Sequence, residues 1–380
     1  VRSFGINVPL LITLTYALGV ALASVAGVIA APIYQVSPMM GSNLVVVVFA
    51  VVVIGGMGSI MGAIVSGFGL GIIEGLTKVF YPEAANLAIF IIMVLVLLCK
   101  PAGLFGKPLQ VQNVLAAEAT REPVQLSRGG MRIAMAALAV AALVAPWFIY
   151  PTFLMKVLCF ALFASAFNLL IGYAGLLSFG HAMFFGSAAY IAGHTIKVWG
   201  WPTEIGLLAG MAVAAVLGLV VGLIAIRRQG IYFAMVTLAL AQMVFFYAVQ
   251  APFTGGEDGI QAIPRRPVLG VIDITNDLTL YYVVLAIFLA GFLVIHRTIH
   301  SPFGQVLKAI RENEPRAISL GYRTDQYKLV AFVLSAALAG LAGATKAVVF
   351  TLASLTDIQW HMSGEVVLMT LVGEIGRAHV

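Results

Sequence analysis

Long apolar runs separated by short polar stretches make up most of this chain. They occupy residues 9–32, 60–77, 84–99, 131–150, 152–173, 179–196, 204–226, 231–251, 278–295 and 329–352. A helix that crosses the hydrocarbon core of a bilayer needs about 20 apolar residues. Most of these runs are apolar on every side, which is typical of helices surrounded by lipid or by other helices. The pattern predicts an all-α, polytopic bundle of transmembrane helices.

The composition excludes several classes of protein. The chain is 62% hydrophobic and 9% charged, whereas a soluble domain is about 45–50% apolar and about 25% charged. A soluble fold of this length has too little interior to bury so much apolar surface. Soluble enzymes, nucleic-acid-binding proteins and disordered chains are therefore excluded. The lipid bilayer is the expected surrounding of the chain.

The distribution of charge predicts the orientation of the helices. The chain carries 21 Lys and Arg residues against 15 Asp and Glu residues. The basic residues gather in residues 100–132, at Arg227 and Arg228, and in residues 297–328. Because loops rich in Lys and Arg stay on the cytoplasmic side, these three regions are predicted to be cytoplasmic. Residues 197–202 and 251–277 are then on the outer side.

Residues 44–77 form an apolar run that fits neither one nor two crossings. As one helix it would extend about 50 Å, which is too long for one span. A half-helix over residues 44–54 that enters and returns solves the problem, with a sharp turn at Gly55, Gly56 and Gly58. The alternative is that these glycines only permit close helix packing.

A change in composition divides the chain. Residues 107–130 are polar and of mixed charge, which predicts a cytoplasmic linker. The linker separates a first membrane module, residues 1–106, from a second one, residues 131–373. Because the chain starts at Val1 and ends in an adapter-like segment, we expect a fragment that is open at both ends. Residues 374–380 back-translate to a common sequencing-adapter string and are interpreted as an artefact.

The two modules contain an internal repeat. Its register is set by pairs of glycines. Gly5 pairs with Gly321 and Gly27 with Gly343 without a gap. After two extra residues in the second copy, Gly55 pairs with Gly373 and Gly58 with Gly376. Both copies start in the cytoplasm, so the repeat is parallel about an axis near the membrane normal. Two such halves can enclose a central path, which is the requirement of a transporter.

The longest cytoplasmic loop of the second module spans residues 301–328. Residues 305–313 favour a helix with apolar side chains on one side and charged ones on the other. Pro315 disfavours helix at Glu314 and can begin a second short turn, which Gly321 can close. The prediction is a short amphipathic element on the cytoplasmic surface. An ordinary solvated loop is the alternative.

Several motifs resemble the permease subunits of branched-chain amino-acid ABC importers. They are residues 55–59, 100–106, 175–182, 230–238, 254–259 and 301–304. The first module resembles the C-terminal part of one permease, and the second resembles its partner almost throughout. The resemblance implies two related permease modules fused in one chain, with discontinuous helices, in the cytoplasmic (inner) membrane of a bacterium.

The resemblance also implies a coupling helix around residues 314–321. The candidate coupling residues are Arg311, Glu312, Asn313, Glu314, Arg316, Ala317 and Gly321. The family's Ala-Ala pair is not intact, since Pro315, Arg316 and Ala317 stand there. The chain has no phosphate-binding loop, because Gly106 and Lys107 are followed by Pro108. ATP hydrolysis is therefore expected in separate ATPase subunits, and an external substrate-binding protein is expected to deliver the amino acid.

Candidate residues of the translocation path or of helix breaks are Gly55, Gly56, Gly58, Ser178, Gly180, His181 and Tyr232. An ionisable residue within a span is a functional candidate by default. The alternative for His181 is a hydrogen-bonded residue at a helix start. The external loop contributes Thr254, Gly255, Gly256 and Asp258.

The sequence contains no catalytic constellation and no metal cluster, so neither an enzyme nor a cofactor is expected. It also contains no paired carboxylates within the spans, which disfavours an ion-coupled carrier. A stand-alone ion-coupled secondary carrier or channel for small solutes nevertheless stays the alternative function.

Overall fold

The structure is a computed structural model that describes residues 7–32, 36–37, 40–106, 137, 140–268 and 270–378. Helices account for most of these residues. Seven of the described helices are long and apolar enough to cross a membrane, and two shorter apolar helices accompany them. The predicted all-α, polytopic fold is confirmed, and the chain is a multi-pass membrane protein.

The helices follow the predicted apolar runs closely. Their bounds are α1 Val8–Ala30, α2 Met40–Gly55, α3 Ile60–Phe80, α4 Ala85–Cys99, α6 Pro151–Asn168, α7 His181–Lys197, α8 Thr203–Ala225, α9 Ile231–Gln250, α10 Asp277–Ile299, α11 Pro302–Glu312, α12 Glu314–Ser319, α13 Thr324–Phe350 and α14 Trp360–Ala378. Short 3-10 turns lie at Pro82–Ala84, Ala145–Trp147, Pro252–Thr254, Gly256–Asp258 and Leu355–Asp357, the last labelled η8. Two short strands, β1 Ile260–Gln261 and β2 Leu352–Ala353, pair antiparallel.

The chain divides into two compact units, residues 1–51 and 52–380. The predicted linker, residues 107–130, lies outside the described residues. The predicted division at this linker therefore stays a prediction. Only residues 137 and 140–150 of the apolar run 131–150 are described. Helix α14 continues through Ala378, so it includes part of the segment interpreted as an adapter artefact.

Helices α2 and α3 are separated at the predicted glycines, while a half-helix that enters and returns stays a prediction. Helix α2 ends at Gly55 and α3 begins at Ile60. Gly56 and Gly58 have φ angles of +102° and +82°, a backbone region that favours glycine. The Ser59 hydroxyl caps α3 by accepting a hydrogen bond from the Gly62 amide at 3.0 Å. The turn therefore needs its glycines for backbone conformation.

The same glycines also permit close packing, so they serve both the turn and the contacts around it. A Cβ atom on Gly55 would lie 2.4 Å from the Gly62 carbonyl carbon, and one on Gly56 would lie 2.2 Å from the Gly106 nitrogen. The amides of Leu104 and Phe105 donate to the Ile54 and Gly55 carbonyls at 2.8 and 3.0 Å. Residues 103–106 thus satisfy the carbonyl groups at the end of α2.

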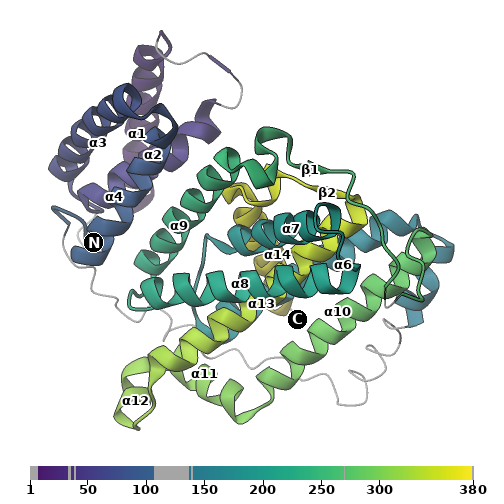
Figure 1. Ribbon diagram of the computed structural model, residues 1–380. Coiled ribbons are helices and arrows are strands. Elements are labelled where there is room, and N and C mark those ends of the chain that lie inside the picture. The colour runs from purple at the N-terminus through teal and green to yellow at the C-terminus, as the bar shows by residue number, and fades with distance from the viewer. Residues whose placement is uncertain are drawn as a thin grey trace. The chain divides into compact units, whose positions relative to one another are not determined.

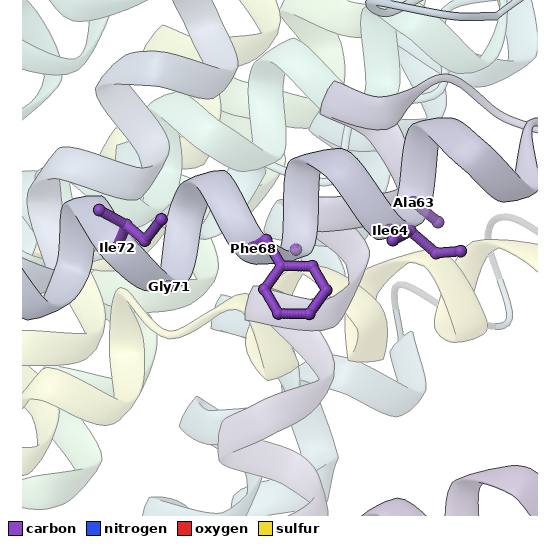
Figure 2. A pocket seen from close by; sticks show the side chains of 6 residues that line it. Ala63, Ile64, Phe68, Gly71 and Ile72 are labelled. Atoms are coloured by element: carbon purple, nitrogen blue, oxygen red, sulfur yellow. The ribbon is translucent and has the colours of Figure 1, made fainter.

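One outward face of α3 is an apolar hollow of about 500 Å³. Figure 2 shows the bulky side chains along it, with small residues between them. The lining residues are Ala63, Ile64, Gly67, Phe68, Gly71 and Ile72. Such alternation of small and large side chains is common on membrane helices that face lipid or another helix.

Helix α13 is the centre of the second module. It packs against α6, α7 and α8, and in Figure 1 it passes between these helices. Small residues allow the close approach: a Cβ atom on Gly343 would lie 1.9 Å from the Phe185 carbonyl oxygen of α7. Tight backbone contacts of this kind hold membrane helices together by dispersion and packing.

The repeat register is visible in the element order. Val8 and Thr324 occupy equivalent positions of the two copies, and they are the first residues of α1 and α13. Each of these helices is followed by a connection and a second apolar helix, α2 or α14. The two copies therefore share the order of their helices, each with a long helix followed by a second one.

Large aromatic side chains lie at the helix ends that were predicted to be outside. Trp199 and Trp201 pack together after α7, with ring centroids 5.0 Å apart. The His194 ring stacks edge-on against Trp199 and Phe253. Aromatic residues collect at membrane–water interfaces. This cluster supports the orientation predicted from the basic residues.

Candidate functional site

The structure places two short helices, α11 and α12, where the sequence predicts an amphipathic element. The Ser301 hydroxyl caps α11 by accepting from the Gly304 amide at 3.3 Å, and the Asn313 side chain caps α12 by accepting from the Arg316 amide at 3.1 Å. Leu307 is fully buried. Gly321, with a φ of +90°, ends the turn after α12. Two capped helices thus form in place of the solvated loop that was the alternative.

Helix α11 lies against the end of α6, where the chain forms a π-helical turn, η5, at Leu169–Ala174. The Arg311 guanidinium donates to the Gly172 carbonyl in this turn. The Lys308 ammonium lies 5.6 Å from the centre of the Tyr173 ring. A π-turn at the end of a helix is often a functional feature. The basic face of α11 is therefore held on the irregular end of a membrane helix.

Helix α12 is attached to two other parts of the second module through Glu314. One carboxylate oxygen accepts from the Lys328 ammonium of α13 at 2.5 Å. The other accepts from the Gln229 side chain, in the turn between α8 and α9, at 3.1 Å. The Lys328 side chain is only 5% exposed, so the pair is largely shielded from water. The pair therefore links α12 directly to α13.

The remaining candidate coupling residues divide into a buried and an exposed group. Ala317 is buried beneath α12. Those that are exposed are Arg311, Glu312, Asn313, Arg316 and Gly321. Their side chains and the open turn give α11 and α12 a polar outer surface. Gln229 and Lys328, which hold the element in place, are not among the residues predicted from sequence.

His181, at the start of α7, is fully buried between α6, α7 and α13. Its Nε2 lies 2.8 Å from the Ser335 hydroxyl, and that hydroxyl donates to the Ala166 carbonyl at 2.5 Å. Since the one hydroxyl proton is used there, Nε2 must carry the proton and donate to Ser335. The rings of Phe167, Phe184 and Phe332 contact the imidazole edge-on. This geometry matches the alternative of a hydrogen-bonded histidine at a helix start, and a path-lining role stays a prediction.

Ser178 and Gly180 lie beside His181 in the connection from α6 to α7. The Ser178 hydroxyl accepts from the Gly180 amide at 3.3 Å. A Cβ atom on Gly180 would lie 2.3 Å from the Thr237 carbonyl oxygen of α9. Tyr232 is partly buried at the start of α9. The structure therefore brings Ser178, Gly180 and His181 together, whereas Gly55, Gly56 and Gly58 belong to the turn between α2 and α3.

The external loop between α9 and α10 is attached firmly to the helix ends around it. The Thr254 hydroxyl is buried and contacts the Ala248 and Ala251 carbonyls at 2.6 Å each. Arg265 binds the Val349 carbonyl and the Asp277 carboxylate, both at 2.7 Å. Gly255 and Gly256 have positive φ angles, and Asp258 is exposed. Of the predicted loop residues, Asp258 is thus accessible, while Thr254 shapes the loop.

A second buried ion pair, Lys346 with Asp357, was missed from the sequence. The Lys346 ammonium lies 2.9 and 2.7 Å from the two Asp357 oxygens. The side chains are 12% and 2% exposed. A lysine within the apolar run 329–352 was the available signal, because charged residues are rare in membrane helices. Its partner lies beyond the end of the run and could not be named.

Comparison with known proteins identifies the family. The family model described as "Branched-chain amino acid transport system / permease component" matches residues 1–98 and 149–379. The chain belongs to this permease family. The match covers both predicted modules and leaves out the predicted linker.

Curated relatives include the permease proteins LivM, LivH and BraD. LivM of Salmonella typhimurium, a permease of high-affinity branched-chain amino acid transport, is 29% identical over 235 residues, which cover 55% of each chain. LivH of Escherichia coli is 40% identical over 112 residues, which cover 29% of this chain and 36% of LivH. BraD of Pseudomonas aeruginosa is 39% identical over 112 residues, with the same coverage.

The chain spans about half the length of LivM, and less of LivH and BraD. No solved structure matches it. Family membership and the helical fold are therefore established.

Proposed function

We propose that this chain is the membrane-spanning permease of an ATP-driven importer. Its substrates are branched-chain or other hydrophobic amino acids, and its location is the cytoplasmic membrane of a bacterium. The observation that supports this most is the attachment of α12 to α13 through Glu314 and Lys328. A polar surface element that is fixed to the central helix of a module would let bound ATPase subunits act on that helix.

The structure suggests how force from ATPase subunits would reach the membrane. An ATPase that closes on nucleotide would move α11 and α12 together. The Glu314–Lys328 pair would pass this movement to α13, and the Arg311 contact would pass it to the end of α6. Helix α13 has 27 residues and is therefore about 40 Å long. The movement would shift the population between inward-open and outward-open states.

Two observations support two related modules in one chain. The family model matches two separate segments, and the relatives include both LivM and LivH. The printed names of both relatives describe permeases of high-affinity branched-chain amino acid transport. We extend this substrate class and the importer assembly to this chain as part of the proposal.

An external binding protein would approach the loop between α9 and α10. The loop is held by Arg265 and by the β1–β2 pairing, so it offers a fixed surface. Asp258 is exposed there. A rigid loop can recognise a partner without a large loss of conformational entropy on binding.

Uptake in reconstituted vesicles tests the proposal. The chain, its ATPase subunits and its binding protein are placed in liposomes, and uptake of radiolabelled leucine is measured with and without ATP. We expect uptake only when ATP and both partners are present. Leucine uptake that continues without ATP but follows an ion gradient would overturn the proposal and favour an ion-coupled carrier.

A further inference from the structure

The Lys346–Asp357 pair lies at the end of α13 that is opposite to the coupling element. Lys346 belongs to the last turns of α13, and Asp357 belongs to the 3-10 turn η8 that precedes α14. In Figure 1, α12 lies at one end of α13 and β2 at the other. Burial of a charge costs several kcal/mol unless it is paired, so such a pair in a membrane protein calls for a reason.

The fold of the helix pair does not supply that reason. The first module contains the equivalent pair, α1 and α2, and Ala30 occupies the position equivalent to Lys346. Residues 31–39, between α1 and α2, contain no charged residue. The first copy of the repeat therefore has no charged residue at these positions, whereas the second copy has an ion pair.

The surroundings of the pair have unused hydrogen-bonding capacity. Gly186 of α7 lets the backbone of Asp357 and Ile358 pack closely, since a Cβ atom there would lie 2.2 Å from the Ile358 side chain. Tyr190 is one turn further along the same face of α7. Its hydroxyl is buried and has no hydrogen-bond partner within the described part of the chain.

The pair has the complementary chemistry for a zwitterion. Asp357 is held from its own turn, because the Ser354 amide and hydroxyl contact one carboxylate oxygen at 3.3 and 3.2 Å. The Lys346 ammonium lies 5.7 Å from the centre of the Phe350 ring, so apolar surface adjoins the charges. The ammonium group of a zwitterion could bind Asp357 in place of Lys346, and its carboxylate could bind Lys346 in place of Asp357.

We propose that Lys346 and Asp357 form a binding site for the charged ends of a zwitterionic amino acid, with Asp357 binding the ammonium group and Lys346 the carboxylate. The inference rests on the proposed function and names the substrate contacts in the second module. In the absence of substrate the two side chains neutralise each other. During exchange each buried charge changes partner, so no charge is left uncompensated.

The position of the site on α13 connects it to the coupling element. Lys328 and Lys346 belong to the same helix, one bound to Glu314 and the other to Asp357. A displacement of α13 by α12 would therefore move Lys346 relative to η8. Movement of the coupling element would therefore open the Lys346–Asp357 pair.

The first experiment measures binding without the ATPase cycle. The purified complex of chain and ATPase subunits, without binding protein, is heated with leucine, with isocaproate, which lacks the ammonium group, or with isoamylamine, which lacks the carboxylate. We expect leucine alone to raise the unfolding temperature. Equal stabilisation by isocaproate or isoamylamine would overturn the proposal. This readout is independent of ATP-driven uptake, so it also separates failure of the site from failure of the proposed function.

The second experiment removes or reverses the charges. The neutral double variant, Lys346→Met with Asp357→Leu, keeps a packed apolar pair, because such replacements of a buried ion pair are often neutral for stability. We expect it to lose leucine stabilisation and to raise the KM for leucine uptake roughly tenfold or more. The charge-swapped variant, Lys346→Asp with Asp357→Lys, restores an ion pair but reverses the orientation of the substrate. We expect the same loss.

A matched control uses the exposed pair of Lys78 and Glu74 on α3, whose atoms are 2.6 Å apart. The variant Lys78→Met with Glu74→Gln should leave leucine binding and KM unchanged. Wild-type KM and leucine stabilisation in either the neutral or the swapped variant of Lys346 and Asp357 would overturn the proposal. Failure of both variants to assemble would assign the pair to structure alone and overturn it as well.

Discussion

At the scale of single residues, two shielded ion pairs link different elements of the second module. Glu314 bonds Lys328, and Asp357 bonds Lys346, in both cases with most of the side chain shielded. His181 is buried, and its Nε2 lies 2.8 Å from the Ser335 hydroxyl. Pairing of this kind removes the penalty of a buried charge. The residues that carry function in our proposal are therefore also residues whose loss affects stability.

Replacement of Glu314 by Gln tests how much the Glu314–Lys328 ion pair contributes to stability and transport. The Lys328 ammonium would be left largely buried without its carboxylate, which we expect to cost about 1–3 kcal/mol. The expected result is a thermal unfolding midpoint lower by several degrees, and less leucine uptake per ATP hydrolysed.

Glu312→Gln is the matched control for this prediction. Glu312 ends α11 with an exposed side chain, so its unfolding midpoint should equal that of the wild type. Equal midpoints for Glu314→Gln and Glu312→Gln would contradict a supporting role of the Glu314–Lys328 pair.

At the scale of elements, the helices of this protein are interrupted at defined points. A turn with glycines separates α2 from α3, α6 ends in a π-turn, and α13 is followed by a strand and a 3-10 turn before α14. Interrupted helices expose backbone groups that need partners. Residues 103–106 provide these partners at the end of α2. The break after α2 is thus satisfied by a neighbouring segment of the chain.

Gly56 and Gly58 provide a graded test of the α2–α3 turn. Both have positive φ angles, but a Cβ atom on Gly56 would meet the Gly106 backbone at 2.2 Å, whereas one on Gly58 meets open space. We expect Gly58→Ala to cost about 1–2 kcal/mol from backbone strain alone. Gly56→Ala should cost more, because the backbone of residues 102–106 must also move.

The measurement for this turn is the amount of folded protein and its unfolding midpoint in detergent. The expected order of stability is wild type, then Gly58→Ala, then Gly56→Ala. A Gly56→Ala variant as stable as Gly58→Ala would show that residues 102–106 do not pack against the turn as described.

At the scale of the whole molecule, the basic cluster around α11 and α12 and the tryptophans after α7 lie at different helix ends of the second module, while Lys197, Arg265 and Arg266 lie on the side of the tryptophans. Arg227, Arg228 and Arg297 lie at or near the same helix ends as the α11–α12 element, while the tryptophans after α7 lie near the external loop. Positive charge stays in the cytoplasm, and aromatic rings gather at the interface. Both signals give the same orientation.

Labelling of single cysteines tests this orientation. Cys99 and Cys159 are first replaced by Ala, and a cysteine is then placed at Asp258 or at Arg316, both exposed. A membrane-impermeant maleimide added to intact cells should label the Asp258→Cys protein, and should label Arg316→Cys only after lysis. Labelling of both positions from the same side would contradict the proposed orientation.

The candidate coupling site was predictable in outline but not in its contacts. Charged and apolar residues alternate with helical spacing in residues 305–313, and Pro315 and Gly321 delimit the second turn, so the two helices follow from local preferences. Gln229 lies far from Glu314 in sequence, and its contact depends on where the turn after α8 is placed. No local pattern encodes that distance.

By itself, the sequence determined the fold class, the main apolar segments and the glycine turn after α2, and it predicted the orientation. These depend on hydrophobicity, charge and backbone freedom, which are properties of each residue and its near neighbours. Only the tertiary structure decided that Lys346 pairs with Asp357, that Lys328 pairs with Glu314 and that His181 donates to Ser335. The reason is physical: in a membrane interior a polar group must find its partner within about 3 Å, and helix packing alone sets which groups come that close.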